Sequence, residues 1–145
     1  MQTKQLFTSF YYYLPSFIFG LIALYAINAQ KITFYYLPLF SFGVIPLIEL
    51  IIPQKSESCQ VSNPFLNSLL TVLIVPFHFY ILLKFLSFIS QNELNLTEFI
   101  GAVLSMGILC GVYGINVAHE LGHRNEKWKQ DLAKLLLLTS LYMHF

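Results

Sequence analysis

Charged side chains are scarce in this chain of 145 residues, where eight basic and seven acidic residues make up 10% of the sequence. Soluble domains carry roughly 25% charged and about 45–50% apolar residues. Here 57% of the residues are apolar, and the mean hydropathy is +0.66. So few polar groups cannot cover the large relative surface of a small soluble domain. The composition therefore argues against an ordinary cytosolic enzyme and against a disordered segment.

Cysteine and net charge are also low, and each shortage excludes a further class. Cys59 and Cys110 are the only cysteines, which is too few for a disulfide framework or a zinc finger. The net charge of +1 does not provide the basic surface that a nucleic-acid-binding protein needs. We therefore expect no nucleic acid partner, and we interpret the chain as an integral membrane protein with the lipid bilayer as its surroundings.

The charges that do occur leave long uncharged runs between them. A transmembrane helix needs about 20 mostly apolar residues to cross roughly 30 Å of hydrocarbon. The sequence predicts an all-α, polytopic transmembrane helical bundle. Four complete spans are expected near residues 9–29, 33–52, 65–89 and 98–118.

A fifth apolar run begins near Leu132 and reaches Phe145. A helix from Asp131 to Phe145 would extend only about 22 Å, which is less than the hydrocarbon thickness. We expect this run to be a truncated fifth span, and the chain to be an N-terminal fragment of a longer membrane protein.

The loops indicate an orientation. With four spans before Arg124, the N-terminus, the 53–64 loop and the 119–131 loop lie on one side of the membrane. That side carries most of the lysine and arginine residues, and the positive-inside rule assigns it to the cytoplasm. We expect a multi-pass protein of a bacterial-type inner membrane, with its N-terminus in the cytoplasm.

Polar residues gather at the expected cytoplasmic end of the fourth span, in the segment 114–124. Residues three and four apart are neighbours on a helix, so Asn116, His119 and His123 share one face. Two imidazoles one turn apart can bind the same metal ion, and Asn116 could hold one ring by a hydrogen bond. A different face carries small residues that suit close helix packing: Gly107, Gly111, Gly114 and Ala118.

Taken alone, residues 119–123 fit the HExxH signature of zinc proteases. In such an enzyme Glu120 would be the general base, acting on a zinc-bound water. A third ligand would have to come from Glu126, Asp131 or His144, and none of these has convincing spacing. A membrane-embedded zinc metalloprotease therefore stays open as the alternative.

The wider sequence context resembles another family. The stretch Asn116-Val117-Ala118-His119-Glu120-Leu121-Gly122-His123-Arg124 resembles the first histidine box of the membrane-bound alkane monooxygenases, in the fatty acid desaturase and hydroxylase-like superfamily. Residues 42–49 are similar to the family's second-span G-x-x-P-L-L-D segment. Residues 75–79 are similar to its V-P-x-H-Y stretch, and residues 142–145 to its G-H-F.

This resemblance implies that residues 1–145 form the N-terminal part of a single alkane hydroxylase-like transmembrane domain. It implies a cytoplasm-facing non-haem diiron centre, a rubredoxin-type electron donor, and O2-dependent terminal hydroxylation of an alkane or fatty-acyl chain. His119 and His123 would be iron ligands, and His144 a further candidate. Glu120 and Glu49 would support a metal-bound histidine by hydrogen bonds.

The sequence departs from the family in its histidine content. The chain has four histidines and one box, whereas the family uses about three boxes. We expect the diiron centre to be completed by histidines that this chain lacks, and the fragment to be inactive alone. His78 lies in mid-span, away from the box, and is expected to line a channel or to be a hydrogen-bonded core residue.

Overall fold

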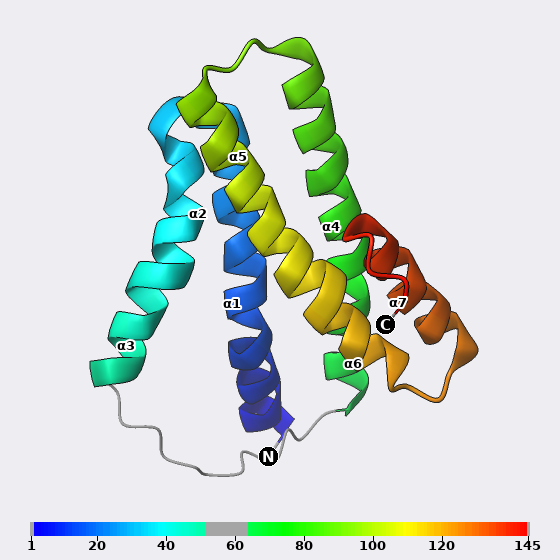
Figure 1. Ribbon diagram of the computed structural model, residues 1–145. Coiled ribbons are helices and arrows are strands. Elements are labelled where there is room, and N and C mark those ends of the chain that lie inside the picture. Colours follow the sequence, from blue (N-terminus) through cyan, green and yellow to red (C-terminus); the bar gives the residue numbers. More distant parts are fainter. Residues whose placement is uncertain (1, 52–63, 145) are drawn as a thin grey trace.

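The chain folds into a bundle of helices (Figure 1), and its computed structural model describes the backbone of residues 2–51 and 64–144 and the side chains of 14–51 and 65–144. No strand occurs within these backbone ranges. The first half contains α1 (Gln2–Ala29), the 3₁₀ helix η1 (Lys31–Tyr35), α2 (Tyr36–Leu39), the π-helix η2 (Phe40–Val44) and α3 (Ile45–Ile51). The second half contains α4 (Pro64–Gln91), α5 (Leu96–Leu109), the π-helix η3 (Cys110–Val117), α6 (Ala118–Gly122) and α7 (Lys127–Thr139).

Within the described residues, three continuous helical rods are long and apolar enough to cross a membrane: Lys31–Ile51, Phe65–Gln91 and Leu96–Gly122. They coincide with three of the predicted spans, so the all-α class is confirmed for this part of the chain, and the length and composition of the rods suit a membrane bundle. The first predicted span, 9–29, lies inside α1, whose described apolar part is the shorter segment Leu14–Ala29. The count of four complete spans stays a prediction.

The rods run alternately up and down. The N-terminus, the end of α3, the start of α4 and the turn between α6 and α7 all lie at the lower end in Figure 1. The sequence predicts one shared side for the N-terminus and for the 53–64 and 119–131 loops; residues 52–63 lie outside the described ranges. Which side of a membrane this end faces stays a prediction.

The fifth apolar run is helical only as far as Thr139, short of the helix length from Asp131 to Phe145 considered above, and the truncated fifth span stays a prediction. Helix α7 ends at Thr139, because the backbone closes it with a Schellman motif. Leu141 has a positive φ of 54°, its N–H donates to Leu138, and the N–H of Tyr142 donates back to the carbonyl of Leu137. Figure 1 shows α7 folded back beside α6 as the second arm of a helical hairpin.

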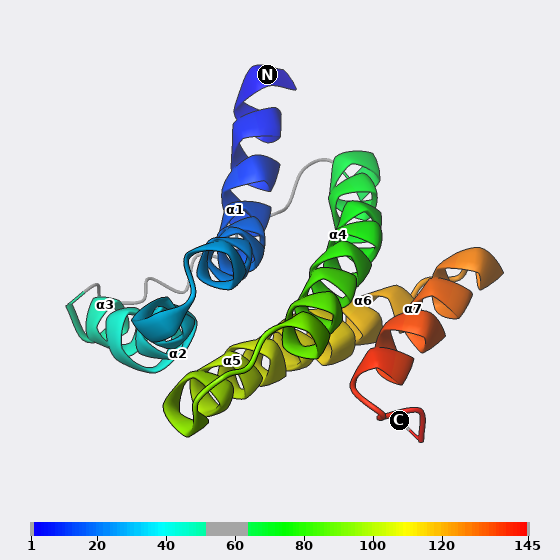
Figure 2. The same ribbon diagram turned by 90° about the horizontal axis from the view of Figure 1, so that it is seen from above.

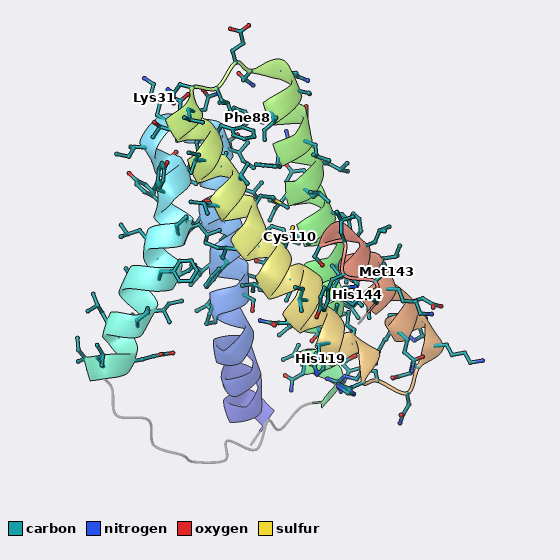
Figure 3. The ribbon with its side chains drawn as sticks, in the orientation of Figure 1. Lys31, Phe88, Cys110, His119, Met143 and His144 are labelled. Carbon is teal, nitrogen blue, oxygen red and sulfur yellow. The ribbon has the colours of Figure 1, made fainter. Side chains whose placement is uncertain are left out.

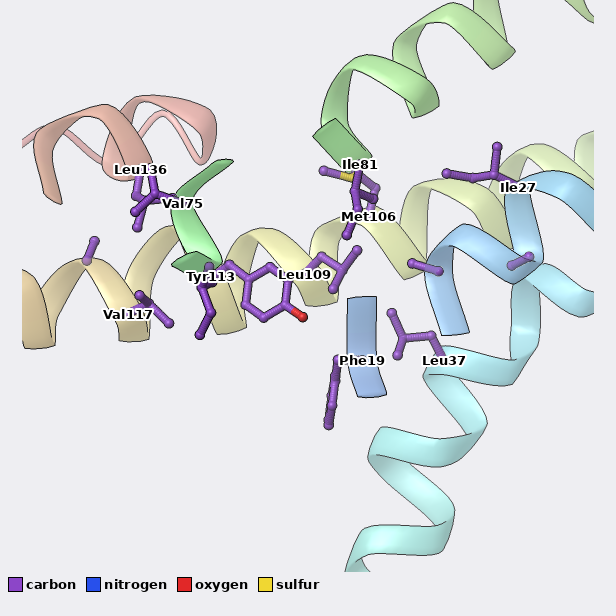
Figure 4. Close-up of a cluster of buried hydrophobic side chains, with 14 of the residues drawn as sticks. Phe19, Ile27, Leu37, Val75, Ile81, Met106, Leu109, Tyr113, Val117 and Leu136 are labelled. Atoms are coloured by element: carbon purple, nitrogen blue, oxygen red, sulfur yellow. The ribbon is translucent and has the colours of Figure 1, made fainter. Parts of the chain in front are cut away.

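The hydrophobic core lies where α1, α4, α5, η3 and α7 meet (Figure 4). Among its most buried members are Leu37, Ile81, Leu109, Tyr113 and Leu136, all completely shielded from solvent. Residues from both halves of the chain enter this cluster, so the described helices form one packed unit around a single core.

Tyr113 joins η3 to α1 through the backbone of α1. Its hydroxyl accepts a hydrogen bond from the Gly20 N–H at 2.9 Å and donates to the Ser16 carbonyl. In a regular helix the Gly20 N–H would donate to Ser16 itself, so the hydroxyl is inserted into the hydrogen-bond ladder of α1. This insertion follows directly after Pro15, which interrupts the same helix.

The predicted stripe of small residues packs over only part of its length. A Cβ on Gly114 would lie 3.0 Å from Thr139 Oγ1 and 3.3 Å from the Leu136 carbonyl, so this glycine allows α7 to approach closely. A Cβ on Gly107 or Gly111 would have no described atom within 4 Å. Within the described ranges, close packing is therefore confined to the end of the stripe nearest α6.

Candidate metal site

The two box histidines face each other at the end of the Leu96–Gly122 rod. His119 is in α6 and His123 directly follows it, one turn further on. Their Nε2 atoms are 3.0 Å apart, and their ring centroids are 4.5 Å apart. The side-chain proximity that the spacing predicts is present in the structure, and both rings are exposed.

This separation fits two bonds to one metal ion. Two nitrogens each about 2.0–2.1 Å from an ion lie about 3 Å apart when the two bonds are near right angles, and about 3.4 Å apart at the tetrahedral angle. The observed 3.0 Å is also the length of a hydrogen bond between the two rings, so the distance does not select one metal over another. The two rings would have to give up this hydrogen bond to bind one ion together.

A groove of about 520 Å³ opens in front of the pair, between α6 and α7. Its lining residues are Ala118, His119, Gly122, His123, Gln130, Ala133, Lys134 and Leu137. Figure 3 shows His119 at the end of the rod beside the lower part of α7. The space next to the histidine nitrogens is therefore bounded by α7.

Glu120 lies outside this groove and contacts α4. Its Oε1 atom accepts a hydrogen bond from Arg124 at 2.8 Å, and it lies 3.3 Å from the Thr71 hydroxyl, which also donates to the Asn67 carbonyl at 2.8 Å. In an HExxH zinc protease the glutamate acts on a metal-bound water, so its carboxylate needs to face the metal. The contacts of Glu120 with Thr71 and Arg124 disfavour that alternative and fit a role in fixing the rotation of α6.

The other predicted site residues lie at different distances from the pair. Asn116 is exposed in η3, less than one turn before His119. His144 is exposed beyond α7, and its ring contacts Tyr142 at 4.4 Å between centroids. Glu49 is exposed on α3, and Figures 1 and 2 place α3 and α6 on opposite sides of α1.

No group of three or more histidine, cysteine, aspartate or glutamate side chains that could hold a metal ion occurs among the described residues. The structure therefore brings His119 and His123 together and does not bring His144 or Glu49 to them. The metal-ligand roles of the two box histidines and of His144, and the supporting roles of Asn116, Glu120 and Glu49, stay predictions.

Sequence reasoning overlooked two buried polar residues of α4, one of which contacts the box hairpin. Thr71 is fully buried and contacts Glu120, while Asn67 is buried one turn earlier. His78, also fully buried, continues the same stripe, because spacings of four and seven residues recur on one helix face. Such a polar stripe on an otherwise apolar span was the available signal.

His78 is a hydrogen-bonded core residue, as one of the two sequence interpretations holds. Its Nε2 lies 2.9 Å from Thr139 Oγ1 at the end of α7. Its ring packs against Tyr113 at 5.6 Å between centroids. It therefore links α4 to the hairpin that carries the box.

Comparison with known proteins identifies relatives of the chain. It is 32% identical over 106 residues to alkane 1-monooxygenase 1 of Alcanivorax borkumensis, a match that covers 69% of this chain and 26% of that protein. The chain is alkane 1-monooxygenase-like. It is also 34% identical over 76 residues to the alkane 1-monooxygenases of Pseudomonas putida and Ectopseudomonas oleovorans, a match to 52% of this chain and 19% of each relative.

These matches confirm the resemblance to alkane monooxygenases that the histidine box and its surroundings indicate. The alkane 1-monooxygenase-like chain spans about a quarter or less of the length of these curated relatives. No protein-family model matches it. No solved structure matches it either.

Proposed function

We propose that this chain is part of an integral-membrane, non-haem diiron monooxygenase that hydroxylates the terminal carbon of alkanes or alkyl chains. The observation that carries the proposal is the 3.0 Å approach of the His119 and His123 Nε2 atoms at the end of an apolar rod that is long enough to cross a membrane. It is supported by sequence identity with proteins named alkane 1-monooxygenase.

The reaction consumes the alkane, O2, two electrons and two protons, and it yields a primary alcohol and water. We propose a rubredoxin-type protein as the electron donor. Bound iron would supply the O2 chemistry, and His119 and His123 would be two of the residues that hold it. An apolar helical bundle suits an alkyl chain, since each buried CH2 group contributes about 0.8 kcal/mol.

The chain's own polar residues would orient this pair. Thr71 of α4 contacts Glu120, and this contact between helices would help to set the rotation of α6 so that the two imidazoles face the groove. Asn116 and Glu49 are proposed as further supporting residues, and His144 as a further ligand only where the additional ligands of a diiron centre are present. Because the sequence contains four histidines, a diiron centre would need ligands in addition to those of this chain.

We also propose that the end of the bundle with the box faces the cytoplasm across a bacterial-type inner membrane. An electron donor in the cytoplasm would then reach the groove directly. Arg124, Lys127 and Lys129 lie around the turn between α6 and α7 at this end, where basic residues suit the cytoplasmic face.

Metal binding by the detergent-purified chain tests the first part of the proposal. Co²⁺ is added anaerobically as a stand-in for Fe²⁺, and bound metal is measured by elemental analysis and visible absorption. We expect one ion per chain, lost in His119→Ala and in His123→Ala. The matched control His144→Ala removes an exposed histidine beyond α7 and is expected to keep most of the affinity. Equal binding by all three variants would refute the site.

A chimera tests the activity. The segment of this chain that contains His119 and His123 replaces its counterpart in the Alcanivorax borkumensis relative, and alcohol formation from a linear alkane is measured with O2 and reduced rubredoxin. We expect terminal alcohol from the chimera and none from its His119→Ala or His123→Ala variant. A well-inserted chimera that keeps hydroxylating after either substitution would show that the pair is dispensable.

A further inference from the structure

The end of α7 is held by a buried histidine of α4. The Thr139 hydroxyl donates to the Leu136 carbonyl at 2.6 Å, so its proton is already used. It therefore accepts the hydrogen bond from His78 Nε2 at 2.9 Å, which places the imidazole proton on Nε2. His78 Nδ1 is buried with no hydrogen-bond partner within the described ranges, so Thr139 is the one polar contact that orients the ring.

Neighbouring contacts fix the same turn of α7 against the membrane-spanning rods. Cys110 Sγ lies 3.8 Å from the Thr139 carbonyl. Gly114 has no side chain between η3 and the carbonyl of Leu136. The hydrogen bond from His78 adds α4 to this arrangement, so the C-terminal end of α7 is anchored on two separate rods.

The other end of α7 is joined to α6 by a short turn, so an anchor at Thr139 determines how α7 lies along α6. That side of α7 carries Ala133, Lys134 and Leu137, which form the wall of the groove facing His119 and His123. Moving Thr139 away from His78 would swing this wall away from the histidine pair.

We infer that His78 is a positioning residue: through Thr139 it holds α7 against α6 and so sets the groove in front of the histidine pair. The purpose of the groove rests on the proposed function. The anchoring itself is a property of the helices and can be measured without any metal.

A disulfide between α6 and α7 provides the measurement. A Cβ built on Gly122 lies 4.0 Å from the Ala133 Cβ, within the roughly 3.5–4.5 Å that disulfides require. The double variant Gly122→Cys/Ala133→Cys is made in the 145-residue chain and oxidised with limiting diamide, which adds no metal. The initial rate of bond formation between the two new cysteines, mapped by mass spectrometry, reports how closely α7 lies along α6.

Two substitutions of His78 separate its hydrogen bond from its bulk. A glutamine amide reaches the position of Nε2, whereas an asparagine amide reaches only that of Nδ1. We expect His78→Gln to keep the parent rate and His78→Asn to slow it about 3- to 10-fold, the change in population that one hydrogen bond supports. Thr139→Val should slow the rate of disulfide formation equally, whereas Thr139→Ser should keep the parent rate. The double variant His78→Asn/Thr139→Val should be no slower than either single variant, because both substitutions remove the same hydrogen bond.

Thr33→Val is the matched control, since it removes another buried threonine hydroxyl, at the opposite end of the bundle. It should leave the rate unchanged, while circular dichroism checks that every variant is helical and folded. The inference is refuted if His78→Asn reacts as fast as the parent, if His78→Gln is as slow as His78→Asn, or if Thr33→Val is equally slow. If the parent chain did not bind Co²⁺, only the proposed function would be contradicted, because the rate of disulfide formation is measured without metal.

Discussion

Replacing Gly20 by alanine tests the insertion of Tyr113 into α1. A Cβ at this position would lie 2.3 Å from Phe77 Cε1 and 2.8 Å from the Tyr113 hydroxyl. The Phe77 ring has little freedom to retreat, because it packs between Phe17 at 5.8 Å and Tyr113 at 6.4 Å between centroids. Either α1 moves away from α4, or the hydroxyl of Tyr113 leaves the helix backbone.

The expected loss of stability follows from three contributions. Overpacking of a filled site costs about 1–3 kcal/mol, and loss of the hydrogen bond between Gly20 and Tyr113 costs about 0.5–1.5 kcal/mol. Alanine is a better helix former than glycine by about 1 kcal/mol, which offsets part of this. We expect Gly20→Ala to lower the free energy of unfolding by about 1–3 kcal/mol.

Unfolding in mixed micelles of a mild detergent and SDS measures this change, followed by the fluorescence of Trp128, the only tryptophan. Gly107→Ala is the control, since its Cβ would meet no described atom within 4 Å. It should be neutral or stabilising by up to about 1 kcal/mol. If Gly20→Ala proves as stable as Gly107→Ala, the packing of Tyr113 and Phe77 against α1 is wrong.

Three further outcomes are expected. Asn95→Ala should destabilise the start of α5 by about 0.5–2 kcal/mol, because Asn95 forms a capping box with Glu98; hydrogen exchange of the first turn measures this. Leu141→Gly should raise the thermal midpoint, since glycine adopts the positive φ of 54° without a Cβ penalty, and an unchanged or lower midpoint would contradict the Schellman closure. The hydrogen bond from Lys129 lowers the pKa of Glu126. This pair therefore stabilises the fold at pH values above the ordinary pKa of a carboxyl group, and its contribution disappears as the pH falls through the lowered pKa. In Lys129→Met, NMR should show the Glu126 carboxyl titrating at a higher pH.

Local spacing predicted the features that depend on one helix alone. The uncharged runs from which spans 33–52, 65–89 and 98–118 are predicted form the three long apolar rods. Such a helix can be identified from its length and composition alone, without knowledge of the helices that pack against it. The approach of His119 and His123 follows equally from a spacing of four residues.

Features that depend on contacts between helices could not be derived in this way. The contact from Thr71 to Glu120 joins residues 49 positions apart, and no local pattern specifies which polar residue of α4 meets α6. The early end of α7 depends on a left-handed backbone at Leu141, a residue type that rarely adopts it. The glycine spacing identified a small-residue face, yet only the position of α7 decides that Gly114 is covered and Gly107 is open.

The π-helix η3 has a consequence for any change in length within the rod. It occupies Cys110–Val117, between α5 and the helix that carries the histidines. Its wider turns change the rotation per residue about the helix axis, and so they set the direction in which the side chains after Val117 point relative to α5. Deleting one residue here would close a wide turn and change this direction, so both imidazoles would turn relative to the groove with their own sequence unchanged. The number of residues in this segment therefore constrains the site as strictly as the identity of its histidines.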